Sequence, residues 1–360
     1  MKDRTAVREA AYLLMLSAAA AALLLFPEVS SAAVVRGLLL CGRVILPSLF
    51  PFFVCSELLT ELSLAQLPAR LFSGLMQPLF HIRGEGAAAL VLGFLGGYPS
   101  GAQITARLYE SGAVSKNEAE RLLLFCNNAG PAFIVGVAGA GVFGSAAAGF
   151  LLWGVHIFCA LLCGVLLRGS KLPMVRRKGE NRSSGGASFA QAFTASVRNA
   201  GASALQVCMF VVIFSVCSAF FQSLLPDGTP APLRVLLVGM LELSNGMAAM
   251  QSAGASLPLA AFLLGFSGLG VWAQTQSLLA ESGLDLRRYL PAKLLHGLLS
   301  ALLTWALARL PAVRDAALPA FSSAGGANTL PLLLPLWGIA GSICLRFRKL
   351  MSSNPVQKRV

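Results

Sequence analysis

The chain has 360 residues, of which 56% are hydrophobic and only 12% are charged, and its mean hydropathy is +0.73. A soluble domain with this balance would have too little polar surface to stay in solution, so the composition excludes an ordinary soluble protein. The net charge of +13 would suit a nucleic-acid partner, but the basic residues cluster in loops beside apolar stretches, which is typical of the cytoplasmic side of membrane proteins. We therefore expect an all-α polytopic membrane protein and no nucleic-acid partner.

Apolar stretches recur along the whole chain, and several reach the roughly 20 residues that a helix needs to cross a bilayer core. They cover 10–26, 34–56, 86–106, 121–143, 145–167, 200–225, 232–250, 256–280, 289–310 and 329–345. We expect about seven to eight transmembrane helices plus two re-entrant helical hairpins, with the lipid bilayer as a partner.

Residues 1–33 are predicted to form an N-terminal membrane helix. Lys2, Arg4 and Arg8 precede its apolar stretch, which would also suit a cleaved signal peptide. The stretch is long, and nothing separates it from the next apolar stretch, so we favour an uncleaved helix.

Glycine and proline interrupt the apolar segment 86–111. Gly93, Gly97 and Gly101 are four residues apart, and Pro99 removes a backbone donor within the same break. Two half-length helices that meet at a tip explain this pattern, because irregular backbone at membrane depth is tolerated where protein or a cavity covers it. The alternative is a kinked crossing helix packed by its glycines. We expect a re-entrant hairpin, whose half-helix N-terminus would suit an anion.

The next helix is predicted from a capping box. Ser115 followed by Glu118 has the spacing of that motif, so a helix is expected to start at about Lys116. It would carry Asn127 and Asn128 inward, roughly three turns further on.

Asn127 and Asn128 are followed by Gly130 and Pro131 within an otherwise apolar run. Two amides and a lost backbone donor are costly in a membrane unless the polar groups find hydrogen-bond partners. Beside a hairpin tip they could replace water around a polar solute. The alternative is that the asparagines tie neighbouring helices together.

A basic loop, 168–190, divides the chain, and the two sides resemble each other. LVLGFLGGYPSGAQITARLYESG (90–112) matches FLLGFSGLGVWAQTQSLLAESG (262–283), and FFVCSELL (52–59) resembles FSVCSAFF (214–221). Internal repeats in a membrane protein point to a two-repeat transporter-like architecture, often with inverted topology and a site at the repeat interface.

The predicted organisation follows from this division. It comprises the membrane helix 1–33, a first repeat 34–167 with the hairpin 86–111, the cytoplasmic loop 168–190, a second repeat 191–310 with a re-entrant hairpin 256–283, and a C-terminal helix and basic tail 311–360.

The second repeat contains a carboxylate within an apolar run, Glu242 in LLVGMLELSNGMAAM (236–250). A carboxylate inside a membrane is expensive, so it predicts a role in ion coupling or gating together with Ser244. Its alternative is a place at an aqueous interface. The basic tail favours a segment 232–250 that crosses the membrane, whereas an inverted repeat requires it to be interfacial.

The candidate site follows from these segments. The predicted substrate-binding residues are Gly97, Ser100, Gly101, Gln103, Asn127, Asn128, Asn245, Gln274, Thr275 and Gln276. His81, His156 and His296 are isolated in the sequence, so we expect interfacial or packing roles for them and no metal site.

The motifs above resemble a known family. VILPSLFPFFVCSELL (44–59), GFLGGYPSGAQITARLYESGAVSKNEAERLLLFCNNAGPAFIVG (93–136) and LELSNGMAAM (241–250) are similar to the sporulation integral membrane proteins called YlbJ or SpoVV, within the nucleoside-recognition or gate domain group. The resemblance covers about residues 35 to 310 and implies a fold similar to concentrative nucleoside transporters, with two re-entrant hairpins. It also implies a role in endospore formation, in which dipicolinic acid crosses the outer forespore membrane.

One departure from the nucleoside transporters bears on the substrate. Their hairpin tip carries Gln-Thr-Glu, whereas this chain has Gln103 without an acidic neighbour and Gln274, Thr275 and Gln276. A tip without a carboxylate is compatible with dipicolinate, which carries two negative charges.

We therefore expect a multi-pass protein of the cell membrane or outer forespore membrane that transports a small anionic solute, dipicolinic acid or a similar dicarboxylate. A nucleoside or neutral-solute transporter and a non-transporting sporulation scaffold are the alternatives. No nucleophile and base pair, phosphate loop or metal cluster is recognisable, so we expect neither an enzyme nor a cofactor. A coupling ion and a homo-oligomeric state are both compatible with this scaffold.

Overall fold

The computed structural model of the chain describes residues 2–62, 64, 66–169, 188–254 and 256–311. This part of the chain is built from helices and contains no strand. Six of its helices are long and apolar enough to cross a membrane, or up to seven if one bent pair counts as a single span. The prediction of an all-α polytopic membrane protein is confirmed. The predicted C-terminal helix and tail, 311–360, and most of the basic loop lie outside the described residues.

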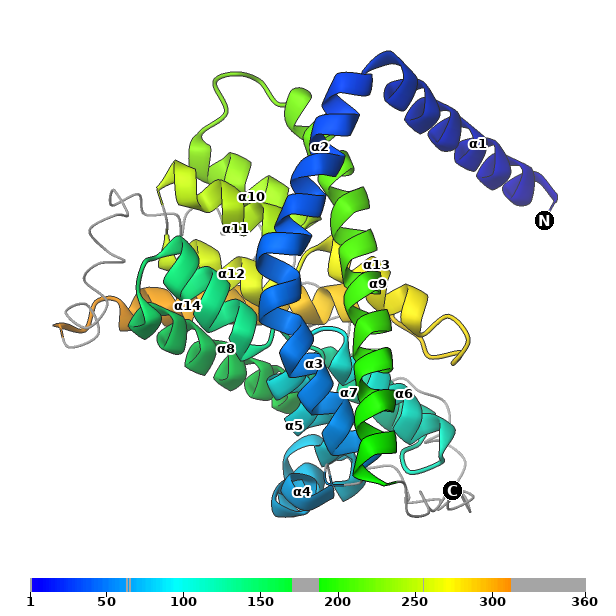
Figure 1. Cartoon of the computed structure of the whole chain (residues 1–360), viewed down its shortest axis with the longest axis vertical. Helices are drawn as coiled ribbons and strands as arrows, with labels where there is room; N and C mark the ends of the chain where they lie inside the picture. The colour runs from blue at the N-terminus through cyan, green and yellow to red at the C-terminus, as the bar shows by residue number, and fades with distance from the viewer. Residues whose placement is uncertain (1, 63, 65, 170–187, 255, 312–360) are drawn as a thin grey trace.

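Two long helices form the centre of the molecule. α2 (Pro27–Leu40), the short π-helical segment η1 (Cys41–Ile45) and α3 (Leu46–Glu61) make one apolar span of 35 residues, and α9 (Phe189–Ser223) makes another of the same length. They lie side by side (Figure 1). A Cβ atom on Gly37 would lie 3.0 Å from the Cα of Val212, so glycine permits this close approach.

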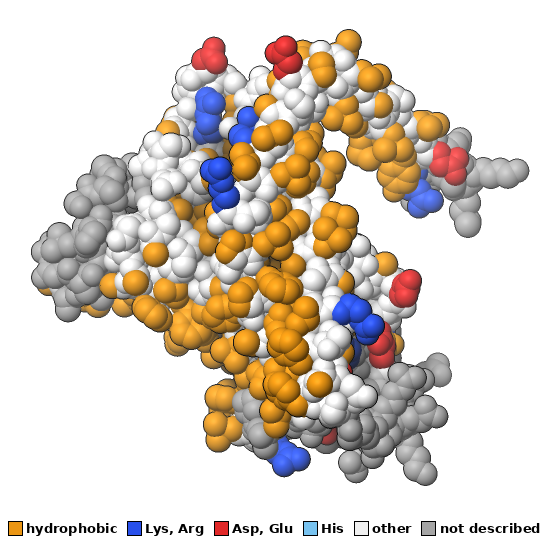
Figure 2. Space-filling view, in the orientation of Figure 1, with side chains coloured by type: hydrophobic (Ala, Val, Ile, Leu, Met, Phe, Trp, Pro, Cys, Tyr) orange, Lys and Arg blue, Asp and Glu red, His pale blue; other side chains and the backbone are white. Residues whose placement is uncertain are grey.

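The outer face of this pair is apolar. Phe52, Leu205, Met209 and Ile213 are exposed on it, and hydrophobic side chains cover much of the visible surface (Figure 2). α1 (Lys2–Leu25) extends away from the other helices and is exposed along its length from Val7 (Figure 1). Exposed apolar surface of this extent is what a bilayer covers.

The predicted hairpin at 86–111 is present as two half-length helices. α4 (Gln66–Phe80) leads through a turn, η2 (Gly84–Gly86), into α5 (Ala87–Gly96), and α6 (Ser100–Glu110) follows after three residues. A Cβ atom on Gly93 would lie 3.1 Å from the Cα of Gly101, eight residues on, so α6 folds back along α5. Gly97 has a φ of +78°, which favours glycine at the reversal. The kinked crossing helix is therefore excluded, whereas re-entry into the bilayer stays a prediction.

α7 (Lys116–Cys126) begins where the capping box predicts. The Glu118 carboxylate accepts from the Ser115 backbone N–H at 2.8 Å, and the Ser115 hydroxyl accepts from the Glu118 N–H at 3.4 Å. The helix ends at Cys126, however, so Asn127 and Asn128 do not lie on its face as predicted. They stand in a break before the π-helical segment η3 (Ala132–Val142), because Gly130 and Pro131 do not support a continuous helix.

The second half contains a hairpin at a different place from the predicted one. α10 (Ala231–Leu241) and α11 (Leu243–Ala253) fold back at Glu242, since a Cβ atom on Gly246 would lie 2.3 Å from the Cα of Gly239. The segment 232–250 is thus two short helices rather than one crossing helix.

The prediction of a re-entrant hairpin at 256–283 is wrong. α12 (Leu257–Phe266) and α13 (Leu269–Leu278) together form one apolar span of 22 residues, broken at Ser267 and Gly268. Both residues have positive φ values, 76° and 88°, but the break contains no proline and the chain does not reverse.

The remaining helices are α8 (Ala146–Leu166) and α14 (Tyr289–Leu307). α8 packs on η3, and α14 packs most extensively on α12. Each half therefore has the same order of elements: a 35-residue helix, a hairpin, a broken helix and a long closing helix. FFVCSELL in α3 and FSVCSAFF in α9 stand at equal distances from the starts of their spans, in agreement with this order.

Candidate functional site

A central pocket lies where the two halves meet. It encloses about 550 Å³ of space not filled by atoms, the open mouth included. Each half contributes its long helix, its hairpin tip and its helix break. The lining residues of the first half are Ile45, Leu49, Tyr98, Ala129, Gly130 and Phe133, and those of the second half are Val207, Phe210, Val211, Glu242, Leu243, Ser244, Gly270, Val271 and Gln274.

The second hairpin brings its carboxylate to this pocket. Glu242 is 4% exposed, and its carboxylate accepts from the Asn245 backbone N–H at 2.7 Å, which caps the start of α11. Ser244 is also buried and lines the pocket. The Glu242 side chain is thus buried at a hairpin tip that lines the pocket.

The first helix break and α13, the helix that follows the second break, both line the pocket. Gln274 is 2% exposed, lines the pocket, and its amide Nε2 has no hydrogen-bond partner among the described residues. Gly130 lies directly against Gly97 of the first hairpin, where a Cβ atom on Gly97 would be 2.8 Å from the Gly130 nitrogen. Gly270, in the first turn of α13, also lines the pocket, and a helix N-terminus carries partial positive charge.

Behind the pocket lies a buried polar cluster centred on Lys293 of α14. This lysine is fully buried, and its ammonium donates to the carbonyl oxygen of Asn127 and, at 2.8 Å, to Oδ1 of Asn128. The Asn127 amide in turn donates to the hydroxyls of Thr275 and Tyr289, each at 3.0 Å. The cluster thus joins the first helix break to α13 and α14.

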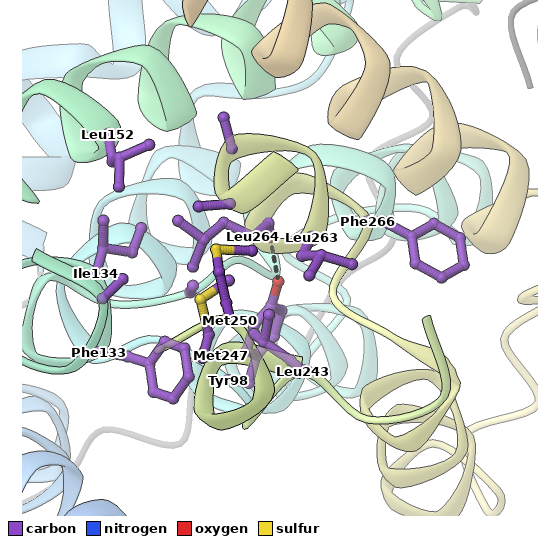
Figure 3. Packing of buried hydrophobic residues seen from close by; sticks show 14 of the residues in the cluster. Tyr98, Phe133, Ile134, Leu152, Leu243, Met247, Met250, Leu263, Leu264 and Phe266 are labelled. Carbon is purple, nitrogen blue, oxygen red and sulfur yellow. Dashed lines mark hydrogen bonds between the residues drawn. The ribbon is translucent and has the colours of Figure 1, made fainter. Parts of the chain in front are cut away.

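Tyr98 connects the cluster with the pocket. Its ring lines the pocket and also lies 5.8 Å from Nζ of Lys293. Its hydroxyl donates to the Ser267 hydroxyl in the second helix break and lies 3.5 Å from the Leu264 carbonyl oxygen, within a core that includes Met247 (Figure 3). The tip of the first hairpin is therefore bonded to the break of the second half.

Two histidines that are isolated in the sequence lie together in the structure. The rings of His156 in α8 and His296 in α14 have centroids 4.5 Å apart, and His296 Nε2 lies 2.9 Å from the His156 carbonyl oxygen. Both are buried, so the interfacial alternative does not apply to them. Among the described residues, no group of three or more histidine, cysteine or acidic side chains could hold a metal ion.

The other predicted site residues do not form one group in the structure. Ser100 and Gly101 are buried at the start of α6, beside the pocket's first hairpin tip. Gln103 donates to the Ser203 hydroxyl of α9 at 2.8 Å and does not line the pocket. Asn245 donates to Ser215 of α9 at 3.0 Å.

Gln276 is exposed, two residues from buried Gln274 on α13. It does not line the pocket, because α13 continues as a helix and turns this side chain outward, whereas the predicted binding role depends on a hairpin there.

The sequence prediction missed Lys293, Tyr98, Tyr289 and Ser267. Lys293 carries a signal that could have found it, since it stands inside the apolar run 289–310, where a charge is expensive. The other three are common in membrane helices, and their position became evident only from the packing.

Comparisons with known proteins agree with this architecture. The family model for Gate, described as nucleoside recognition, matches residues 43–226. The sporulation integral membrane protein YlbJ of Bacillus subtilis (strain 168) is 32% identical to the chain over an alignment that covers 76% of each protein. No solved structure matched the chain.

The residues that match the Gate model begin in the first long helix and extend to the end of α9. They include the first hairpin and the asparagine pair in the helix break after α7. The resemblance that the sequence motifs indicated is thus confirmed, as is a multi-pass location in the membrane. The chain belongs to the Gate family and, within it, to the sporulation integral membrane proteins similar to YlbJ.

Proposed function

We propose that the protein transports a small anionic solute across a membrane and that dipicolinate, made during sporulation, is that solute. The observation that carries the proposal is the central pocket, to which both halves contribute a hairpin tip and a helix break. Broken helices are costly in a membrane unless they line a cavity, and transporters bind their substrates at such breaks between repeats.

The chemistry of the lining supports a polar solute. Gln274 offers an unpartnered amide, and the N-terminus of α13 offers partial positive charge. We assign Glu242 and Ser244, at the tip of the second hairpin, to ion coupling or gating, since a cation held by Glu242 would offset the repulsion between this carboxylate and an anionic solute. The similarity to the sporulation integral membrane protein YlbJ supports a role in spore formation, and we propose the outer forespore membrane as the site of transport.

The test is uptake of labelled dipicolinate into proteoliposomes that contain the purified protein. Gln274→Leu removes an amide from the pocket, and Gln276→Leu makes the same change on the exposed face of α13. We expect uptake that requires the protein, a reduction of about tenfold or more in Gln274→Leu, and no change in Gln276→Leu. Equal uptake by both variants would contradict the assigned pocket.

Two other functions are distinguished by the same assay. The Gate model is described as nucleoside recognition, which favours a nucleoside or other neutral solute as the second candidate. Uptake of labelled uridine that unlabelled uridine inhibits and dipicolinate does not would support that candidate. Folded protein that moves neither solute would support a scaffold without transport.

A further inference from the structure

Lys293 is a buried cation without an acidic partner. Its side chain is fully buried in α14, and none of the ion pairs among the described residues includes it. Its two acceptors, the Asn127 carbonyl and the Asn128 amide oxygen, are both neutral. An ammonium ion has three N–H donors, so these acceptors leave one donor without an assigned bond.

A buried ammonium ion is costly in a low-dielectric interior unless an opposite charge accompanies it. The protein lowers this cost only in part. Two carbonyl-type oxygens accept from the ammonium, and the rings of Tyr98 and Tyr289 lie 5.8 and 5.6 Å from Nζ, where their negative faces attract a cation. The surroundings thus prepare a place for a cation but supply no full negative charge. An anionic ligand would supply the missing negative charge.

The pocket is where such a ligand would come from. Tyr98 lines the pocket, and the centroid of its ring lies 5.8 Å from Nζ of Lys293, so this side chain stands between the pocket and the lysine. Gln274, whose Nε2 has no partner, lies in the pocket beside Thr275, and Thr275 is bonded to Asn127 of the cluster. A second donor therefore lies in the pocket, one residue from a member of the Lys293 cluster.

We propose that Lys293 binds a carboxylate group of the transported solute, assisted by the amide of Gln274. In this bound state the ammonium exchanges its bonds to Asn127 and Asn128 for the carboxylate, which releases the helix break after α7. The proposal rests on the proposed transport function and makes it more specific: the solute is a carboxylate, and its charge is recognised by α14. A neutral nucleoside would leave the buried charge uncompensated.

The first test is the affinity of purified protein for dipicolinate and for its neutral diamide, which has nearly the same shape. Lys293→Met keeps the length of the side chain and removes the charge. We expect affinity for dipicolinate to fall about 10- to 100-fold, as for the loss of a charge-assisted hydrogen bond, and affinity for the diamide to stay the same. Lys116→Met removes an exposed lysine and is expected to change neither affinity.

The second test adds a negative charge inside the protein. In Asn128→Asp the new carboxylate lies at the position of an oxygen 2.8 Å from Nζ, so it pairs with Lys293 and competes with the ligand. We expect dipicolinate affinity to fall to a similar extent while the unfolding temperature stays at or above that of the unmodified protein. This variant decides the question if Lys293→Met does not fold.

The outcomes separate the two proposals. If unmodified protein binds and transports dipicolinate and the folded Lys293→Met and Asn128→Asp variants bind it equally well, the assignment of Lys293 is overturned and transport stands. If the unmodified folded protein neither binds nor transports dipicolinate, the proposed function itself is overturned.

Discussion

The hydroxyl of Tyr98 links the two halves of the protein through a single side chain. It donates to Ser267, which is 1% exposed and stands in the break between α12 and α13. A hydrogen bond between buried groups contributes about 1 kcal/mol to stability, and the loss of one partner leaves the other unsatisfied. The first hairpin tip is thereby held against the second half.

Removal of this hydroxyl should weaken the contact without creating a cavity. We expect Tyr98→Phe to reduce the free energy of unfolding by about 1 kcal/mol, because Ser267 then loses its partner. Thermal unfolding in detergent measures the effect. Tyr12→Phe, on the exposed face of α1, is the matched control, and equal unfolding temperatures for the two variants would refute the role of Tyr98.

Glu118 links the start of α7 to the loop before α5, outside the membrane spans. Burial raises the pKa of its carboxyl group, but the hydrogen bonds from Arg83 and Ser115 outweigh burial and bring the pKa below its ordinary value of 4.5. A carboxylate with a lowered pKa stabilises the folded protein above the pKa of the unfolded state, and this contribution is lost as the pH falls through the folded-state pKa.

We therefore expect the unfolding temperature to fall as the pH is lowered below about 4.5, with part of this fall due to Glu118. Glu118→Gln should be less stable at neutral pH and should show a flatter pH dependence in that range. Glu110→Gln, which changes an exposed carboxylate at the end of α6, serves as the control. A slope in Glu118→Gln identical to that of the unmodified protein would argue against this assignment.

At the scale of the elements, glycines determine which helices can fold back on each other. The α10 and α11 helices cross at Gly239 and Gly246, where a Cβ atom on Gly246 would lie 2.3 Å from the Cα of Gly239. No rotation of a side chain relieves a contact with backbone atoms. The two helices would have to separate.

Gly246→Ala should therefore destabilise the second hairpin by about 1–3 kcal/mol, the usual cost of overpacking. Gly201→Ala in α9 is the matched control, because a Cβ atom there meets nothing within 4 Å. In the control we expect no loss of stability, or an increase in the free energy of unfolding of up to about 1 kcal/mol, because alanine has a better helix propensity than glycine. Limited proteolysis of the loops around 231–253 measures the effect locally, and equal protection of both variants would contradict the packing.

The two hairpins show how far sequence patterns predict elements. Gly97 and Pro99 mark the first reversal, and the capping box marks the start of α7, because both signals act on the local backbone. The sequence predicts the second hairpin at the wrong place, because similarity of residues 262–283 to residues 90–112 does not extend to similarity of shape. Ser267 and Gly268 break a helix without reversing it, whereas Glu242 starts a new helix by capping it.

At the scale of the whole molecule, transport by this architecture requires one half to move relative to the other. Gln103 in the first hairpin and Ser203 in α9 are hydrogen-bonded across the two halves at 2.8 Å. In a protein without its native cysteines, Gln103→Cys with Ser203→Cys should be joined by a short bis-methanethiosulfonate reagent. We expect the cross-link to stop uptake and a reductant to restore it.

The single-cysteine variants are the controls for that experiment and should lose little activity on treatment. Full uptake by completely cross-linked protein would show that the first hairpin and α9 move as one body. The moving contact would then lie elsewhere between the halves.

Composition and motifs are sufficient to show that the chain is a helical membrane protein with two related halves, and to indicate its family. These properties depend on the length and spacing of apolar runs and on local motifs, all of which are read along the chain. The sequence also singles out Asn127, Asn128, Glu242 and Gln274, because polar groups in apolar runs are expensive and therefore conspicuous.

How these groups combine depends on the packing of helices that are distant in the sequence. The ammonium of Lys293 meets Asn128 across 165 positions of sequence, and Tyr98 meets Ser267 across 169. Such contacts depend on which helices pack together and on which face each one presents. A buried cation and its neutral acceptors leave no joint pattern in the chain, because folding alone brings them to the same place.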